Sequence, residues 1–430
     1  MKKYIKPQKS YYKTSILFTF VCLLLLFVSC TEKKHIEPII IWTNKSELVG
    51  FAELFNASSE NAKAVIIYKE NPAASFNSVT KDEIPDIVIG SWLNSSETAN
   101  NFLPITYLFE DQLISESQFY PQLLKHGQIR DQQYLLPVSF NIPAIIYSIT
   151  NEQYVTENTL ITTEEIKTAA ATFNKTEKEH YVAMGYAPSW EPEFMYEVAK
   201  LNGADFLQPT DKDSLFSWEE GNLQNTVGYF IDWTKEHNST TESESTYKYK
   251  YLSNPVLNNV SSNRMLFTYM PSNELFVYPE ERLETVRFKW LHKNNQLLIQ
   301  DEMLSMGLYK HSKNVANAEE FIIWFMNPDN QEDMLQWTNS VNLYTKPFGI
   351  AGGFSSIRSV NERYFPVEYP QLWGNLPLQE NLVVPNELPE YWQTIKEQVL
   401  LPYLQEASVT PSEIEIESVQ SRVNKVYRYE

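Results

Sequence analysis

The sequence predicts an α/β fold of two lobes with a ligand cleft between them. The chain is 430 residues long, which exceeds the usual size of one compact core and favours two domains. Near the start of the body, short apolar runs alternate with an amphipathic segment, as in a parallel sheet with covering helices. Further along, the segment 134–148 has the pattern of a chain that passes from one domain into another.

The segment 134–148 reads Tyr-Leu-Leu-Pro-Val-Ser-Phe-Asn-Ile-Pro-Ala-Ile-Ile-Tyr-Ser, with two apolar runs that are each short enough for a buried strand. Pro137 and Pro143 lack an amide donor, so neither suits the middle of a central strand. A polar and aromatic break at 139–141 separates the runs. This pattern is typical of a crossing between two sheets, and a crevice between domains is a usual place for a ligand. Two ordinary core strands joined by a loop would explain it equally well.

The start of the body predicts the first lobe. Residues 39–42 are a continuous apolar run, as in a buried parallel strand, and residues 47–56 have the apolar spacing of a helix. Further strands are predicted at 64–68 and within 85–92. Ligands of such sheets bind outside the carboxyl ends of the strands. By contrast, the polar segment 236–246 predicts a surface loop.

The N-terminal segment is predicted to be an export signal that ends in a lipid anchor. Five lysines without any acidic residue precede an apolar run at 16–28, which is shorter than the ~20 residues that span a bilayer. Residues 27–30, Phe-Val-Ser-Cys, resemble the lipobox of bacterial lipoproteins. This resemblance implies that Cys30 is lipidated and holds the protein on the membrane. A plain secretory signal with a chance cysteine is the alternative.

Composition argues against several functions. The chain holds 35 Lys and Arg against 54 Asp and Glu, so its surface repels phosphate backbones and nucleic-acid binding is not expected. Cys22 and Cys30 are the only cysteines. Cys22 lies within the removable segment and Cys30 is the candidate lipidation site, so the body has no free thiol for a disulfide or for catalysis. The six histidines lack metal-binding spacing. We therefore expect neither a metal nor a cofactor.

Several further motifs follow one another along the body. They include the leading strand that ends in Trp42, Pro-Asp-Ile-Val at 85–88, Leu-Pro-Val-Ser-Phe-Asn-Ile-Pro-Ala at 136–144, the segment 186–206 that ends in Gly-Ala-Asp-Phe, and Arg-Met-Leu-Phe-Thr-Tyr-Met at 264–270. Together they resemble the extracellular solute-binding proteins of ABC importers, particularly the sugar-binding group that includes maltose-binding protein. The segment 303–311 resembles the strand that returns to the first lobe in that group.

The resemblance implies a periplasmic-binding-protein-like fold whose two lobes close on the ligand like a flytrap. The implied hinges lie near 139–141, 308–309 and 341–344. The implied organisation is a signal peptide at 1–29, the lipidated cysteine and a tether at 30–37, a first lobe at 38–139 plus 309–340, and a second lobe at 140–308 plus 341–430.

A carbohydrate cleft needs flat aromatic rings for the sugar faces and polar groups for the hydroxyls. Both kinds of side chain occur at predicted loops and element ends, where ligand contacts are common. The strongest candidate is Trp190, which is flanked by Pro188 and Pro192. We expect Trp190→Ala to weaken binding about tenfold with little effect on thermal stability. The candidate ligand-binding residues are Trp42, Asn44, Ser91, Trp92, Phe140, Asn141, Trp190, Glu191, Tyr269, Gly307 and Trp373.

We therefore expect a monomeric, lipid-anchored protein outside the bacterial cell membrane that captures a small solute, a carbohydrate, for the permease of an ABC importer. The sequence contains no Gly-x-Ser-x-Gly, His-Glu-x-x-His or phosphate-binding glycine motif, and we expect no catalytic residues. A surface enzyme acting on polysaccharide and an adhesive or structural lipoprotein are the alternatives. The acidic composition leaves a cationic ligand open.

Overall fold

The structure is a computed structural model that describes residues 37–79, 83–95, 97–209, 215–340, 346–410 and 414–426. Residues 1–37 and 38–430 form separate units. The predicted signal peptide, Cys30, the tether up to residue 36 and the predicted hinge at 341–344 lie outside the described residues. Among the helices that the structure describes, none is both long and apolar enough to cross a membrane.

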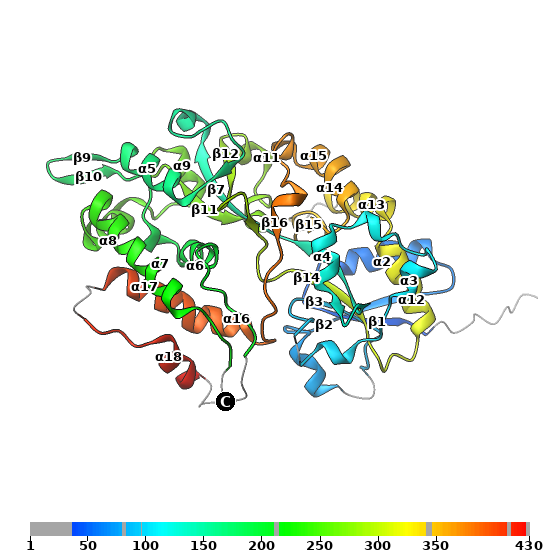
Figure 1. Cartoon of the computed structure of the whole chain (residues 1–430). Helices are drawn as coiled ribbons and strands as arrows, with labels where there is room; N and C mark the ends of the chain where they lie inside the picture. Colours follow the sequence, from blue (N-terminus) through cyan, green and yellow to red (C-terminus); the bar gives the residue numbers. More distant parts are fainter. Residues whose placement is uncertain are drawn as a thin grey trace, which may run out of the picture. The chain divides into compact units, whose positions relative to one another are not determined.

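The first sheet has six strands in the order β15-β6-β14-β3-β1-β2 (Figure 1). Strand β1 pairs in parallel with β2 and β3, whereas β14 runs antiparallel to β3 and β6. Strands β3, β6 and β14 are buried along their whole length, which explains why their sequences are nearly continuous apolar runs. Their bounds are β1 Ile39–Thr43, β2 Ala64–Tyr68, β3 Ile87–Gly90, β6 Leu135–Phe140, β14 Leu304–Leu308 and β15 Phe354–Ser355.

Three helices pack beside the first sheet, α2 (Leu48–Ser58), α12 (Val315–Phe325) and α13 (Pro328–Ser340). Their aromatic residues interlock, since the Phe51 ring of α2 meets Phe325 edge-on at a centroid distance of 6.3 Å. Gly50 is required at this contact, because a Cβ there would lie 1.8 Å from the indole of Trp337. The apolar face predicted for residues 47–56 therefore packs in the core of the first lobe.

The second sheet has four strands in the order β11-β7-β12-β8. Strand β7 pairs antiparallel with β11 and β12, and β12 pairs in parallel with β8. Helices α6 and α7 pack with α17 in the same lobe (Figure 1). The bounds are β7 Pro143–Ser148, β8 Leu160–Ile161, β11 Thr268–Pro271, β12 Val286–Leu291, α5 Thr163–Phe173, α6 Pro192–Leu201, α7 Glu220–Trp233, α8 Thr241–Tyr251, α9 Val256–Ser261 and α17 Leu401–Val409.

Shorter elements connect these layers. The short helices are α3 Tyr107–Glu110, α4 Pro121–His126, α10 Ser272–Leu275, α11 Glu280–Leu283, α14 Arg358–Arg363, α15 Phe365–Glu368, α16 Trp392–Ile395 and α18 Val419–Val426. The short strand pairs are β4 Gln128–Ile129 with β5 Gln132–Gln133, β9 Lys175–Glu177 with β10 His180–Ala183, and β13 Leu297–Leu298 with β16 Leu382–Val383.

The chain crosses between the two sheets where the sequence indicates. Strand β6 belongs to the first sheet and β7 to the second, and only Asn141 and Ile142 separate them. A second crossing runs from β12 of the second sheet to β14 of the first. The two crossings touch, because the backbone amide of Gln300 donates to the carbonyl oxygen of Asn141 at 2.9 Å. The alternative of two core strands within one sheet is thereby excluded.

Strand pairing does not follow two of the lobe boundaries that we expected. Strand β14 lies within 140–308 and β15 lies within 341–430, both assigned to the second lobe, yet both strands pair in the first sheet. Each is too short to reveal its sheet from its own sequence, because the pairing partner is distant along the chain. The segment 236–246 also differs from its prediction, since it contains the start of helix α8.

Candidate ligand cleft

A cleft of about 710 Å³ lies where the ends of first-sheet strands face the second lobe. From the first lobe it is lined by Asn44 and Lys45 after β1 and by Ser91 and Trp92 after β3. Because carboxyl ends of parallel strands meet at the same edge of a sheet, these residues converge as predicted from their positions. The second lobe and the crossings contribute Asn141, Trp190, Glu191, Pro192, Glu193, Val256, Tyr269, Met270, Pro271, Asn273, Glu274, Gln300, Glu302, Gln393, Lys396 and Glu397.

Three polar atoms that line the cleft are buried and have neither a hydrogen-bond partner nor an ion-pair partner in the described structure, Asn44 Oδ1, Trp92 Nε1 and Asn273 Oδ1. A buried polar atom without a partner is costly, by about 1–3 kcal/mol. Trp92 also has a φ of 58°, a left-handed conformation that is uncommon for a residue other than glycine. Such strain is characteristic of functional sites.

Asn141 joins the crossings at the base of the cleft. Its Nδ2 donates to the carbonyl oxygen of Gly352 at 2.9 Å, and its Oδ1 accepts from the Ser272 hydroxyl at 2.7 Å. Gln300, which donates to the Asn141 backbone, also brings its Nε2 within 3.4 Å of the Tyr269 hydroxyl. The Asn141 side chain therefore has protein partners at both of its polar atoms and positions the crossing.

Trp190 and Glu191 are held firmly by the second lobe. Trp190 is only 6% exposed and stacks on Tyr247 at a centroid distance of 5.9 Å. The Glu191 carboxylate accepts hydrogen bonds from Tyr186 (2.6 Å), the Thr268 hydroxyl (2.5 Å) and the backbone amide of Tyr269 (2.8 Å). Burial raises the pKa of Glu191, and these donors oppose that rise. Only a small part of Trp190 is left for a ligand, so we revise the expected effect of its removal on stability.

Lys396, from the C-terminal part of the chain, lies among carboxylates on the second-lobe wall. Its Nζ is 2.7 Å from Glu302 Oε1 and 3.5 Å from Glu193 Oε2, and the side chain is buried. Burial opposes its charge, but the carboxylates of Glu302, Asp301 and Glu193 raise its pKa above the usual range. Burial also raises the pKa of Glu193 and of Glu274, with Lys396 opposing both rises.

Behind this wall, Asp301 fixes the second crossing against helices α6 and α16. Its carboxylate lies 2.8 Å from Lys200 Nζ and accepts from the Tyr196 hydroxyl at 2.5 Å and from Trp392 Nε1 at 3.2 Å. Burial disfavours its charge, yet the lysines and these donors lower its pKa. Lys200 also lies 3.1 Å from Glu197, whose pKa burial raises to about 7. One lysine thus serves two carboxylates, of which Asp301 has a lowered pKa and Glu197 a raised one.

Seven of the predicted residues line the cleft, namely Asn44, Ser91, Trp92, Asn141, Trp190, Glu191 and Tyr269. Two other predicted aromatics lie in apolar cores. Trp42 is 1% exposed and packs near Phe76, at a ring distance of 6.1 Å. Phe140 is equally buried and stacks on Phe354 at 5.6 Å. Both residues belong to central strands of the first sheet, where both faces are covered.

Gly307 and Trp373 also lie outside the cleft. A Cβ at Gly307 would meet the Phe102 ring at 2.4 Å and Leu135 at 2.7 Å, so this glycine serves packing within the sheet. Trp373 is 79% exposed on a loop. Sequence reasoning missed nine polar residues of the cleft, which carry no motif of their own, Lys45, Glu193, Asn273, Glu274, Gln300, Glu302, Gln393, Lys396 and Glu397.

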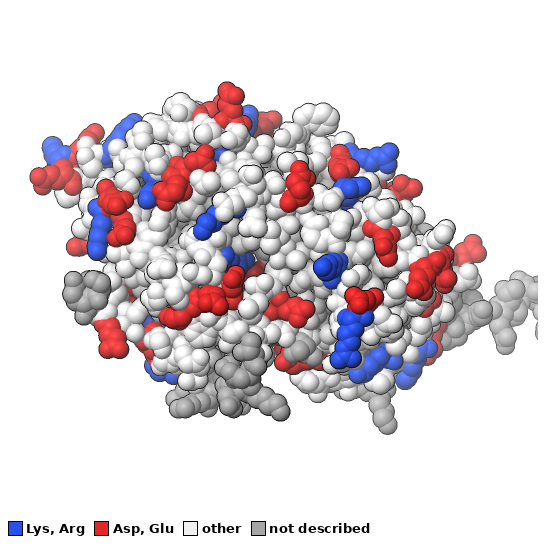
Figure 2. All heavy atoms as spheres, in the orientation of Figure 1, with Lys and Arg blue, Asp and Glu red and all other residues white. Residues whose placement is uncertain are grey.

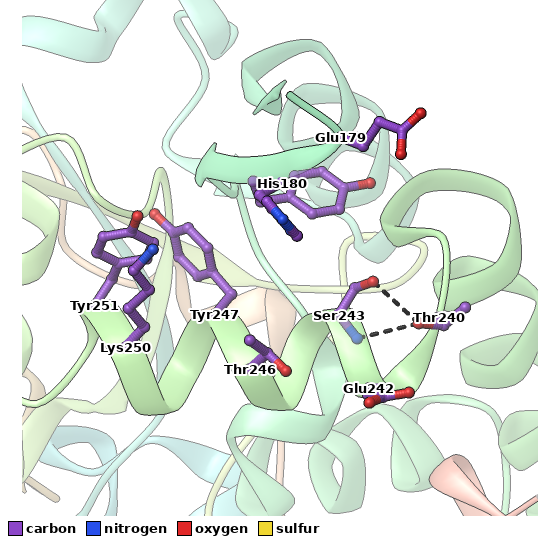
Figure 3. Close-up of a pocket in the computed structure, with 10 residues that line it drawn as sticks. Glu179, His180, Thr240, Glu242, Ser243, Thr246, Tyr247, Lys250 and Tyr251 are labelled. Atoms are coloured by element: carbon purple, nitrogen blue, oxygen red, sulfur yellow. Dashed lines mark hydrogen bonds between the residues drawn. The ribbon is translucent and has the colours of Figure 1, made fainter. Parts of the chain in front are cut away.

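A second cavity of about 360 Å³ lies between the β9–β10 hairpin and helix α8 (Figure 3). The rings of Tyr247 and Tyr251 lie on one wall, with centroids 4.9 Å apart. Figure 3 shows Thr240 and Ser243 hydrogen-bonded at the start of α8, so their polar atoms serve as the helix cap. All walls belong to one lobe, and occupancy of this cavity would not bridge the two sheets.

Two sheets joined by adjacent crossings, with a polar and aromatic cleft beside them, define a two-lobed α/β binding protein. The family model described as bacterial extracellular solute-binding protein matches residues 78–346. The chain belongs to this family, which confirms the predicted resemblance. No match was found among curated proteins.

Solved structures share the fold over almost the whole chain. The sugar-binding protein MalE from the phytopathogen Xanthomonas citri is 14% identical with a TM-score of 0.65, and the match covers 91% of this chain and 96% of that one. CpMnBP1 with mannobiose bound is 13% identical with a TM-score of 0.60, covering 90% and 98%. Maltose-bound T. maritima MalE3 is 14% identical with a TM-score of 0.59, covering 91% and 99%. At these identities the likeness establishes the two-lobed fold.

Proposed function

We propose that this protein captures a carbohydrate in the cleft and delivers it to the permease of an ABC importer, without catalysing a reaction. The observation that carries the proposal is the group of buried, unpartnered polar atoms on Asn44, Trp92 and Asn273, which come from both lobes. Sugar hydroxyls both donate and accept hydrogen bonds, so one ligand could satisfy all three atoms. The sugar-bound structures among the neighbours support this choice of ligand.

Closure of the lobes would follow from the same arrangement. A ligand that contacts residues of both lobes binds the closed state more tightly and shifts the population toward it. The crossings at Asn141 and Gln300 are the places where the chain passes between the sheets. We propose that the backbone rotates there.

The lipid anchor and the location are part of the proposal. A lipidated Cys30 would hold the protein outside the cell membrane, close to the permease, and the family is extracellular by its description. The protein would act as a monomer.

The chain has a strongly acidic composition, with 54 acidic against 35 basic residues. Figure 2 shows Asp and Glu side chains over both halves of the visible face.

A thermal-shift screen of the full chain in detergent tests the carbohydrate assignment. Mono- and oligosaccharides are compared with amino acids, peptides and polyamines. A ligand at about 100 times its dissociation constant stabilises a protein by ~2.7 kcal/mol, or a few degrees. A saccharide hit supports the proposal, whereas hits confined to peptides or amino acids would contradict it. A hydrolysis assay of each saccharide hit checks for turnover, which would favour the enzyme alternative.

A further inference from the structure

We propose that the cleft selects a saccharide that carries a protonated amine. The inference rests on the proposed function and names the chemical class of its ligand. Three observations support it. The cleft wall carries more carboxylates than lysines, most of the unpartnered polar atoms are hydrogen-bond acceptors, and aromatic residues line the same cleft.

The charge of the lining is unbalanced. Five glutamates and two lysines line the cleft, which leaves an excess of three carboxylates when all are ionised. Lys396 is already engaged, because its Nζ lies 2.7 Å from Glu302 and 3.5 Å from Glu193. Lys45 follows β1 in the first lobe, whereas the glutamates belong to the second lobe and the crossing. The second-lobe wall is therefore acidic beyond what its own lysine can neutralise.

Two carboxylates on this wall have no basic partner within ion-pair distance among the described residues. Glu274 lies on the short helix α10, directly after β11, and it forms no ion pair there. Glu397 accepts a hydrogen bond from the neutral Gln393 at 2.5 Å. Both side chains are exposed to solvent. A cation bound near either of them would supply the missing charge, with an attraction that salt weakens.

The carboxylates converge on one aromatic residue. Burial raises the pKa of the Tyr269 hydroxyl, and Glu197, Glu193, Glu274 and Glu302 raise it further. Four carboxylates from α6, α10 and the second crossing thus act on the same phenol. Since Tyr269 lines the cleft, these carboxylates lie near a residue that the ligand would contact.

The unpartnered atoms favour a ligand rich in hydrogen-bond donors. Asn44 Oδ1 and Asn273 Oδ1 are acceptors without a partner, and Trp92 Nε1 is the one unpartnered donor that lines the cleft within the described structure. Glu193 Oε2 has no hydrogen bond but lies 3.5 Å from Lys396 Nζ. A protonated amine offers three donors and no acceptor, whereas a hydroxyl offers one donor. The indole of Trp92 can stack on a sugar ring and attract a cation to its face. An amino sugar combines both properties.

Titration of the full chain in detergent with three disaccharides of one backbone tests the inference. The probes are β-1,4-linked disaccharides of glucosamine, of N-acetylglucosamine and of glucose, at about pH 6, where the amines are protonated. The disaccharide of glucosamine should bind at least about tenfold more tightly than either neutral analogue. Its advantage should shrink at high salt, because ions screen the attraction.

Each other outcome of this titration has a definite meaning. Equal or tighter binding of a neutral disaccharide, or of maltose or mannobiose, would overturn the inference and support the proposed function. Absence of binding by every saccharide would overturn both.

Substitutions locate the selectivity in the wall. In Glu274→Gln the ratio of the affinity for the disaccharide of glucosamine to that for the neutral analogues should fall about threefold or more. Glu193→Gln should act in the same direction. The control is Glu60→Gln, on an exposed residue away from the cleft, which should leave the preference unchanged. An unchanged preference in both cleft variants would also overturn the inference.

Discussion

The backbone amide of Gln300 donates to the carbonyl oxygen of Asn141 at 2.9 Å. This single bond joins the two crossings between the sheets, and both residues line the cleft. A ligand in the cleft would therefore lie beside the segments that connect the lobes. The predictions below concern this junction, the cleft walls and the proposed anchor.

The Asn141 side chain is expected to stabilise the crossing. Asn141→Ala removes the hydrogen bonds to Gly352 and from Ser272, and at about 1 kcal/mol each the free energy of unfolding should fall by ~2 kcal/mol. Asn141→Asp keeps the acceptor for Ser272 and should lose less. Chemical denaturation measures both variants, and an unchanged midpoint in Asn141→Ala would show that the crossing is held by other contacts.

Trp92 is expected to be the main stacking surface. Trp92→Ala should weaken saccharide binding by about 1–3 kcal/mol, by analogy with stacking on other aromatic side chains. Trp92→Gly should weaken binding as much but lose less stability, because glycine adopts the φ of 58° freely. Trp373→Ala is the matched control, since that residue is exposed outside the cleft. Calorimetric titration with the best saccharide from the screen decides the matter, and equal affinity in Trp92→Ala would remove Trp92 from the site.

Trp190 is expected to contribute mostly to stability. Its ring is 6% exposed and stacks on Tyr247, and its Nε1 donates to the Glu244 carbonyl oxygen at 3.2 Å. Removal of so buried an aromatic side chain costs about 3–5 kcal/mol. Trp190→Ala should therefore lower the melting temperature clearly, and Trp190→Phe should lower it less. A melting temperature close to that of the wild type would restore the original expectation of a mainly ligand-binding role.

Glu197 is expected to make stability decline as pH rises from about 4.5 to about 7. Its pKa is about 7 in the folded protein and near the ordinary glutamate value of 4.5 when unfolded, so the folded state binds more protons across this window. Stability must then fall with rising pH. Glu197→Gln removes this slope, and the exposed-residue variant Glu53→Gln should retain it. Denaturation at several pH values measures the slope, and an identical slope in Glu197→Gln would assign it to other groups.

Cys30 is expected to carry the membrane anchor. Cys30→Ser should abolish incorporation of labelled fatty acid and release the protein from the membrane fraction. Two acyl chains or more are needed for stable attachment, because each buried methylene contributes ~0.8 kcal/mol. Continued membrane association of an unlabelled Cys30→Ser protein would point to attachment by another segment.

Local signals explain what the sequence could predict. The polar break and Pro143, the first residue of β7, mark the first crossing. Pro137 lies within β6 opposite Ser305, beside a shift in the strand register that accommodates a proline. Asn44, Ser91 and Trp92 were placed in the cleft by a general rule for strand ends. Trp42 also stands near the end of a predicted strand. In the structure it lies within β1, between its partners Ile67 of β2 and Val88 of β3, and it is therefore buried.

The missed residues of the cleft depend on tertiary structure. Lys396 and Glu397 come from the C-terminal part of the chain, and Glu302 lies on the second crossing. Nothing in their local sequence says that these segments meet at one wall. Helix α8 begins within 236–246, where the Thr240 hydroxyl accepts a hydrogen bond from the Ser243 amide at 3.1 Å and caps the helix. In the sequence, this single capping residue is a weaker signal than the polar composition of the segment, which predicted a loop.

The central claim is that a saccharide draws the two lobes together around the cleft. The body lacks cysteine after Cys30, so dyes can be placed on Glu53→Cys of α2 and Tyr249→Cys of α8, which are both exposed and lie in different lobes. Energy transfer between them, measured during saccharide titration, should rise saturably, and the rise should need far more saccharide in Trp92→Ala. A constant signal with every saccharide, or the same titration curve in Trp92→Ala, would contradict the account.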